Sequence, residues 1–139
     1  MKIDADRERE LIAVLSDLME KPSTSPQDCG CQDTIDAFIT PLGFTCNHLP
    51  FEDVSNLWAT KSGSKPGPTL IFAGHTDVVP AGNLASWDCD PYKANISGDL
   101  ITGRGTADMK GALAAMLIAA KAFQNRNRHY LGRLGFLIT

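Results

Sequence analysis

The sequence predicts an α/β fold in which helices pack on a mixed, mostly parallel sheet. Three features predict it. Apolar residues recur at helical spacing between Asp6 and Met19. The uninterrupted apolar run from Thr69 to Gly74 is typical of a strand buried on both faces. From Asp108 to Phe123 the helical spacing returns with many alanines, which allow a helix to approach a sheet closely.

The remaining elements follow in chain order. The proline-containing segment Lys21 to Pro26 ends the first helix, and a second helix is expected from near Asp28 to Thr40, ended by Pro41-Leu42-Gly43. Residues 61–68 predict a turn between two extended segments, and residues 80–106 predict a long loop with a hairpin around Ser97-Gly98-Asp99. Further strands are expected at Phe44–Leu49, Asn56–Thr60 and Arg133–Thr139.

The composition suits one compact domain of 139 residues, 43% of them hydrophobic. A net charge of -3 without a cluster of Lys and Arg argues against a nucleic-acid partner, and a solvated helix end explains the locally basic stretch Lys121 to Arg133. No apolar run approaches the roughly 18 residues of a membrane span, and no secretory signal is present, so we expect a cytoplasmic protein without a membrane partner. Reduced thiols are expected at Cys29, Cys31, Cys46 and Cys89.

The chemistry is expected at His75, Asp77 and Asp108. His75 and Asp77 directly follow an apolar strand, where open α/β sheets place ligands, and their i, i+2 spacing allows them to converge. A metal-binding histidine commonly donates from its other ring nitrogen to a carboxylate, a role open to Asp77. Asp108 follows a glycine-bracketed turn and is a second candidate ligand. The alternatives are an ordinary His-x-Asp polar pair and a helix cap at Asp108 or Thr106.

The joint pattern of these motifs resembles the zinc aminoacylase and carboxypeptidase family. The residues that carry the resemblance are Gly74–Pro80, Trp87, Pro91-Tyr92 and Gly103–Gly111. Within that family the wording of Pro22–Pro26, Phe72–Pro80 and Ala107–Gly111 is most similar to the succinyl-diaminopimelate desuccinylases. The resemblance implies that His75 binds one zinc, that Asp108 bridges two zincs, and that Asp77 is a catalytic residue supporting His75.

The reaction implied is hydrolysis of N-succinyl-diaminopimelate to succinate and diaminopimelate, in lysine biosynthesis, with two zinc ions and cobalt as a plausible substitute. The partner would be a small-molecule N-acyl amino acid, and the full-length parent would be a homodimer. Acetylornithine deacetylase and dipeptidase activities of the same family stay open as alternatives.

The resemblance also implies that residues 1–139 are the N-terminal part of a metallohydrolase catalytic domain, without the dimerisation domain. In the family, the general-base glutamate and further metal ligands follow the strand that matches Leu134–Thr139. One histidine and one bridging carboxylate are fewer than the three protein ligands of a catalytic zinc. We therefore expect an incomplete domain with weak zinc binding, little turnover and exposed apolar surface beside Leu134–Ile138. The alternative hypothesis is that the chain is a truncated, non-enzymatic product.

Overall fold

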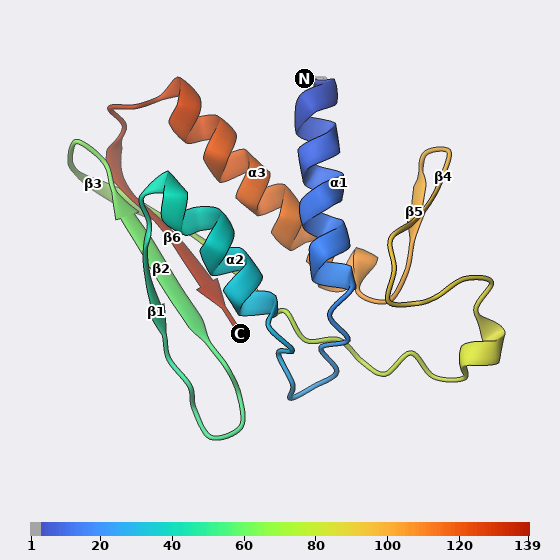
Figure 1. The fold of residues 1–139 in the computed structure, drawn as a ribbon. Helices are drawn as coiled ribbons and strands as arrows, with labels where there is room; N and C mark the ends of the chain where they lie inside the picture. Colours follow the sequence, from blue (N-terminus) through green and yellow to red (C-terminus); the bar gives the residue numbers. More distant parts are fainter. Residues whose placement is uncertain (1–3) are drawn as a thin grey trace.

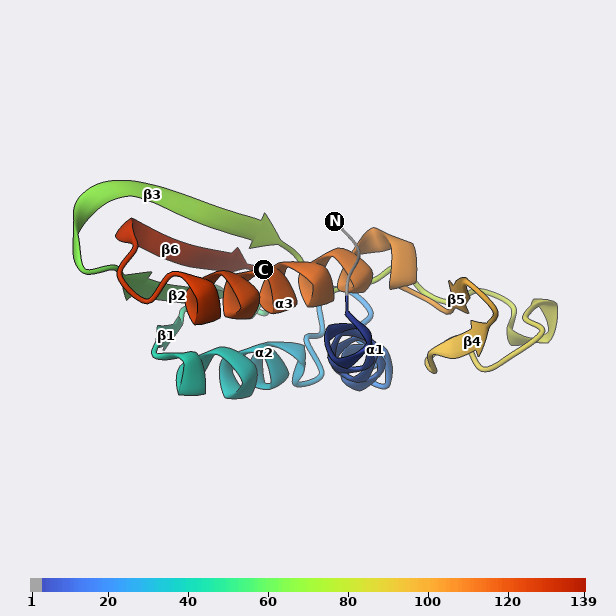
Figure 2. The same cartoon turned by 90° about the horizontal axis from the view of Figure 1, so that it is seen from above.

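The structure is a computed structural model that describes residues 4–139. It has two layers, a four-stranded sheet and three helices that lie together on one of its faces (Figures 1 and 2). The helices are α1 (Ala5–Met19), α2 (Cys31–Ile39) and α3 (Gly111–Arg126). The sheet strands are β1 (Thr45–His48), β2 (Leu57–Ser62), β3 (Lys65–Gly74) and β6 (Leu131–Ile138). All three predicted helices and all four predicted sheet strands are confirmed, with shifted ends.

The sheet has the strand order β1-β2-β6-β3. Pairing is antiparallel between β1 and β2 and between β2 and β6, and parallel between β3 and β6. The expected mixed sheet is confirmed, but the expectation that it is mostly parallel is wrong. A short connection at residues 49–56 returns β1 onto β2, which forces an antiparallel pair, and only β3 reaches its neighbour through a helical crossover, α3.

The strand β3 differs most from its prediction. It begins at Lys65 instead of Thr69, so the predicted turn at residues 61–68 shrinks to residues 63–64 between β2 and β3. It lies at the edge of the described sheet, and Leu70 and Ile71 are 56% and 46% exposed. The expectation of a strand buried on both faces is therefore wrong, because the described helices cover one face only and β6 covers one edge.

The core lies between the helices and the inward-facing residues of the sheet. Phe136 of β6 is fully buried and packs against Phe44 and Phe72, with ring centroids 5.5 and 5.1 Å away. The other face of the sheet is open. Leu137 points to this open face and is 43% exposed, whereas its chain neighbours Phe136 and Ile138 point inward and are buried. The exposed apolar surface expected near this strand is therefore present.

Residues 80–106 form an arm that extends away from the sheet (Figures 1 and 2). The arm contains the short helix η2 (Leu84–Ser86) and a hairpin of β4 (Asn95–Ser97) and β5 (Leu100–Thr102). This confirms the predicted long loop with a hairpin at residues 97–99. Within residues 4–139, no helix combines the length and apolar character that crossing a membrane requires.

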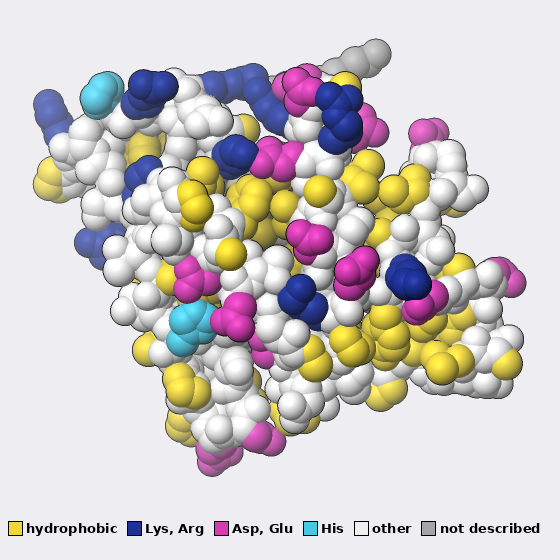
Figure 3. Space-filling view, in the orientation of Figure 1, with side chains coloured by type: hydrophobic (Ala, Val, Ile, Leu, Met, Phe, Trp, Pro, Cys, Tyr) yellow, Lys and Arg dark blue, Asp and Glu magenta, His cyan; other side chains and the backbone are white. Residues whose placement is uncertain are grey.

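Charged side chains are unevenly distributed over the surface. Figure 3 shows Lys and Arg side chains gathered at the upper left, over the end of α3 and the start of β6, and Asp and Glu side chains mainly elsewhere. The locally basic stretch noted in the sequence, Lys121 to Arg133, runs through this region. It includes a helix end, where basic side chains are favourable toward the negative end of the helix dipole.

Candidate metal centre

The structure brings His75 and Asp108 together. β3 ends at Gly74, so His75 is the first residue after the strand. Asp108 lies in the π-helical turn η3 (Thr106–Lys110), which leads into α3. Nε2 of His75 lies 3.1 Å from Oδ1 of Asp108. Two residues that are 33 positions apart in sequence thus present a nitrogen and an oxygen to one point, as predicted.

Asp77 contacts the opposite side of the same imidazole. Nδ1 of His75 lies 2.9 Å from the main-chain oxygen of Asp77 and 3.3 Å from its carboxylate Oδ1. The Asp77 carbonyl oxygen and the Asp108 carboxylate both accept hydrogen bonds, so either ring nitrogen can carry the proton. With the proton on Nδ1, the lone pair of Nε2 is open to a metal ion. Asp77 thus lies against His75, but both residues follow the strand, so strand alternation is not what brings them together.

The exit segment of α1 holds the segment that carries His75 and Asp77. The hydroxyl of Ser23, which is fully buried, donates to the main-chain oxygen of Thr76 over 2.8 Å. The amide of Val78 donates to the main-chain oxygen of Ser23 over 2.8 Å, and the hydroxyl of Ser25 donates to Oδ2 of Asp77. Sequence reasoning missed these roles of Ser23 and Ser25. The only available signal was their place in the motif Pro22–Pro26.

The turn around Asp108 has a non-helical backbone. Asp108 itself has φ -135° and ψ 99°, and Gly105 before the turn has φ +84°. A side chain at position 105 would place Cβ 2.7 Å from Val78, so glycine is required for both reasons. Neither Asp108 nor Thr106 caps a helix through its side chain, so the capping alternative is wrong. The Asp108 side chain is instead 86% exposed and able to receive an ion.

Lys110, at the end of the same turn, is fully buried. Its ammonium donates to the main-chain oxygens of Leu18 and Lys21 at the end of α1, over 2.8 and 2.6 Å. Burial lowers the pKa of this ammonium, and the nearby thiol of Cys31 opposes that shift. This lysine could not be singled out from the sequence, because its partners are main-chain atoms about 90 positions away.

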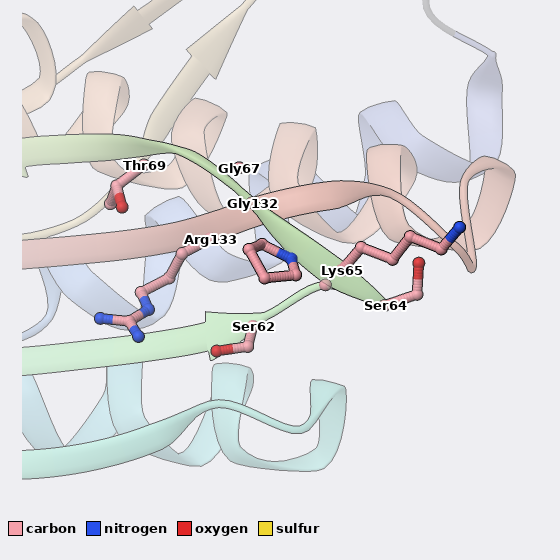
Figure 4. Close-up of a pocket in the computed structure, with 9 residues that line it drawn as sticks. Ser62, Ser64, Lys65, Gly67, Thr69, Gly132 and Arg133 are labelled. Carbon is pink, nitrogen blue, oxygen red and sulfur yellow. The ribbon is translucent and has the colours of Figure 1, made fainter.

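A pocket of about 270 Å³ adjoins the three predicted residues. Its wall also includes Ser25 and Arg104, whose guanidinium lies 5.5 Å from the ring of Trp87 on the arm. A larger pocket, about 460 Å³, lies at the opposite end of the sheet, where β3 and β6 begin (Figure 4). Its lining contains hydroxyls, Lys65 and Arg133 but no histidine or carboxylate, so it does not compete as a metal site.

Residues 71–139, which carry His75 and Asp108, match the model of peptidase family M20/M25/M40. The chain belongs to this family. The family resemblance of the sequence is thereby confirmed at the level of the M20 peptidases, and the fold of the whole chain agrees with that of solved structures.

Three of those structures are the di-peptidase Dug1p of Saccharomyces cerevisiae, the M20 metallo-carboxypeptidase Sso-CP2 of Sulfolobus solfataricus and the YXEP protein of Bacillus subtilis, a dinuclear metal-binding peptidase. Dug1p is 18% identical, with a TM-score of 0.81 over 96% of this chain and 32% of its own. Sso-CP2 is 27% identical, with a TM-score of 0.79 over 93% and 30%. YXEP is 20% identical, with a TM-score of 0.65 over 98% and 36%. This M20 chain therefore spans about a third of the length of each.

The donor types in this M20 chain fit zinc. Nε2 of His75 and a carboxylate oxygen of Asp108 are both common zinc ligands, and Nε2 is free to bind when the ring proton is on Nδ1, toward Asp77. The number of donors is small. Among residues 4–139, no group of three or more His, Cys, Asp or Glu side chains lies close enough to hold a metal ion. The described residues thus bring together two candidate ligands, fewer than the three of a catalytic zinc.

Proposed function

We propose that this chain supplies His75, Asp77 and Asp108 to the two-zinc centre of an enzyme that hydrolyses N-succinyl-diaminopimelate to succinate and diaminopimelate. The observation that carries the proposal is the approach of Nε2 of His75 to Oδ1 of Asp108, 3.1 Å apart, beside a pocket. Polar groups at the end of a strand, next to a cavity, are where α/β enzymes place their reacting groups.

Each of the three residues has a distinct role in the proposed centre. His75 would hold one ion through Nε2, the exposed carboxylate of Asp108 would be a ligand shared by both ions, and Asp77 would accept the proton of Nδ1 and orient the imidazole. When bound, zinc or cobalt supplies the Lewis acidity that polarises the scissile carbonyl and activates water. Further ligands and the general base come from outside the described residues, because residues 4–139 contain no complete cluster.

The substrate is proposed from the wording of the motifs Phe72–Pro80 and Ala107–Gly111, which is most similar to that of desuccinylases. A second candidate is peptide hydrolysis, favoured by the 27% identity to the carboxypeptidase Sso-CP2. Deacylation of acetylornithine is a third activity of the same chemical type. We propose a homodimer for the full-length protein in each case.

The first experiment tests the metal site in this chain. Zn²⁺ or Co²⁺ is titrated into the wild-type chain, His75→Ala and Asp108→Ala. We expect weak binding by the wild type and loss of binding in both variants, because each removes one of only two donors. Binding that is unchanged in His75→Ala would contradict the proposed centre. Asp53→Ala, which removes an exposed carboxylate in another loop, is the matched control.

The second experiment tests the reaction. Hydrolysis of N-succinyl-diaminopimelate, N-acetylornithine and a dipeptide is compared for this chain and for the complete reading frame that encodes it. We expect little turnover by the chain, and preference for the succinylated substrate by the complete protein. Preference for the dipeptide would favour the peptidase candidate. Robust turnover by the chain with two tightly held zinc ions would overturn the proposal that its centre is incomplete.

A further inference from the structure

Lys110 is a buried cation that lacks an acidic partner. It has no exposed surface, and no ion pair involves it among residues 4–139. Lysine is almost never fully buried without a charged partner, because removing an ammonium from water is costly. The position of Lys110 therefore requires a specific compensation.

That compensation comes from the end of α1. The ammonium of Lys110 donates to the main-chain oxygens of Leu18, 2.8 Å away, and of Lys21, 2.6 Å away. Carbonyl groups at the C-terminus of a helix carry the partial negative charge of the helix dipole, so a cation is favourable there. Lys110 thereby joins the turn η3 to the exit segment of α1.

The same exit segment also holds the other half of the candidate metal centre. Ser23, two residues after Lys21, donates to the main-chain oxygen of Thr76 and accepts from the amide of Val78. Ser23 thus holds the segment that carries His75 and Asp77. Lys110 attaches the turn that carries Asp108 to Lys21, two residues earlier in the same exit segment. The distance between the two candidate ligands depends on both attachments.

Within the turn, main-chain hydrogen bonds constrain the position of Asp108. The amide of Lys110 donates to the main-chain oxygen of Gly105 over 2.8 Å, and the amide of Gly111 donates to that of Thr106. The carboxylate of Asp108 is 86% exposed and contacts the imidazole of His75. Its position is therefore set by the turn. Lys110 attaches the turn to the end of α1, as does the hydroxyl of Thr106, 3.2 Å from the sulfur of Met19. The sulfur of Met109 also accepts from the amide of His75 over 3.4 Å.

We propose that Lys110 is a positioning residue that fixes Asp108 relative to His75 by attaching η3 to the end of α1. The proposal rests on the proposed function, since it matters only if the two residues share a metal centre. The competing account is that Lys110 merely stabilises the fold, in which case its loss would weaken metal binding no more than any other loss of stability.

The test compares Lys110→Met, which keeps an unbranched side chain and removes the ammonium, with Leu117→Ala. Leu117 is buried in α3, is only 1% exposed, and is not among the residues that line the site pocket. A milder variant, Lys110→Gln, retains a neutral donor and covers the case in which Lys110→Met does not fold. Co²⁺ is titrated into each protein, and amide hydrogen exchange is measured on the metal-free proteins.

We expect Lys110→Met to raise the Co²⁺ dissociation constant about 10-fold or more, as loss of an outer support of a metal ligand does. The amides of residues 110 and 111 should exchange faster than in the wild type, relative to those of β6. Leu117→Ala should lower the melting temperature comparably and leave the dissociation constant within about twofold. Lys110→Gln should lie between the wild type and Lys110→Met in both measurements.

Three outcomes would overturn the proposal. One is an unchanged dissociation constant in a folded Lys110→Met protein. Another is equal weakening in Leu117→Ala, and the third is failure of both Lys110 variants to fold while Leu117→Ala folds, which would assign Lys110 to stability. If wild-type Co²⁺ binding does not depend on His75, the proposed function fails instead. Hydrogen exchange then still decides whether Lys110 holds the turn, and unchanged exchange at residues 110 and 111 would overturn that attachment.

Discussion

The imidazole of His75 has two acceptors on its Nδ1 side, and they contribute differently. The main-chain oxygen of Asp77 at 2.9 Å can accept the proton of Nδ1, while the carboxylate Oδ1 at 3.3 Å adds a negative charge. Asp77→Asn keeps the first acceptor and removes the charge. We therefore expect a loss of Co²⁺ affinity near 10-fold, at the low end of about 10- to 100-fold for such supports.

A Co²⁺ titration of the chain checks this prediction. Asp88→Asn serves as the control, since it removes an exposed carboxylate on the arm that does not line the site pocket. If Asp77→Asn abolished binding as completely as His75→Ala, Asp77 would be a metal ligand and not a support for His75.

The stability of the fold should also depend on pH through Asp36, which lies away from the candidate metal centre. The Thr40 hydroxyl, 2.6 Å from Asp36, is the main cause that lowers the pKa of Asp36 below 3.8, and His48 contributes over 3.0 Å. A carboxyl whose pKa is lower in the folded state stabilises the fold above pH 3.8, and this stabilisation is lost as the pH falls through the lower, folded-state pKa.

Thr40→Val should therefore reduce the free energy of unfolding at pH 7 by about 0.5–1.5 kcal/mol, the contribution of a typical hydrogen bond. The difference from wild type should shrink as the pH falls below 3.8. Urea unfolding at pH values on both sides of this window measures it. Thr45→Val on β1 is the matched control, and a difference from wild type that persisted undiminished in acid would contradict the assignment to Asp36.

At the scale of elements, alanine substitution at two glycines distinguishes the cost of backbone strain from the cost of a steric clash. Gly132 in β6 has φ +87°, and an added Cβ would lie 2.0 Å from the main-chain oxygen of Pro68 in β3. Gly98 in the β4–β5 turn has φ +58°, and nothing lies within 4 Å of an added Cβ. Alanine at either position adopts a left-handed conformation, which costs roughly 1–2 kcal/mol.

Gly98→Ala should lose about that amount of stability. Gly132→Ala should lose clearly more, because β3 and β6 must also move apart where their register is irregular. Chemical unfolding of both variants measures the difference. Equal losses would mean that the two strands separate at this point without cost.

The helices and strands could be predicted because each is encoded locally, by apolar spacing and by the prolines and glycines that end it. What could not be predicted depends on long-range pairing. The apolar run at Leu70 and Ile71 does not reveal whether another strand lies beside it, and the order β1-β2-β6-β3 depends on contacts between distant residues.

The same distinction applies to the candidate site. His75, Asp77 and Asp108 were predicted because their side-chain chemistry and motif wording are specific. Ser23 and Lys110 were not singled out, because they act through main-chain atoms far away in the sequence. A hydroxyl or an ammonium in a loop or helix does not indicate which carbonyl it will meet.

At the scale of the whole molecule, the sheet has one covered face and one open face, and β3 is an edge strand of the described sheet. The first half of β3 contains Pro66 and Pro68, which cannot donate to an added strand. Its second half, from Thr69 to Gly74, has neither proline nor charge, and Leu70 and Ile71 are exposed. Such an edge invites pairing with another copy of the chain.

We therefore predict that this chain self-associates as its concentration rises, and that Ile71→Lys shifts it from mostly associated to mostly monomeric. Leu70 and Phe72, the neighbours of Ile71 in β3, pair with the inward-facing Leu134 and Phe136, whereas Ile71 pairs with Gly135. Successive side chains of a strand point to opposite faces of the sheet. Ile71 thus points to the open face, where lysine is tolerated and a charge opposes both edge pairing and stacking of open faces.

Light scattering coupled to gel filtration measures the effect, and circular dichroism confirms that the fold is kept. Leu84→Lys introduces the same charge at a 62% exposed position on the arm, so it separates the effect of location from that of net charge. A wild-type chain that stayed monomeric at every concentration would show that the β3 edge does not pair with another copy. If Leu84→Lys shifted the chain to the monomer as much as Ile71→Lys does, the association would depend on overall charge, because the two variants differ in where the lysine is placed.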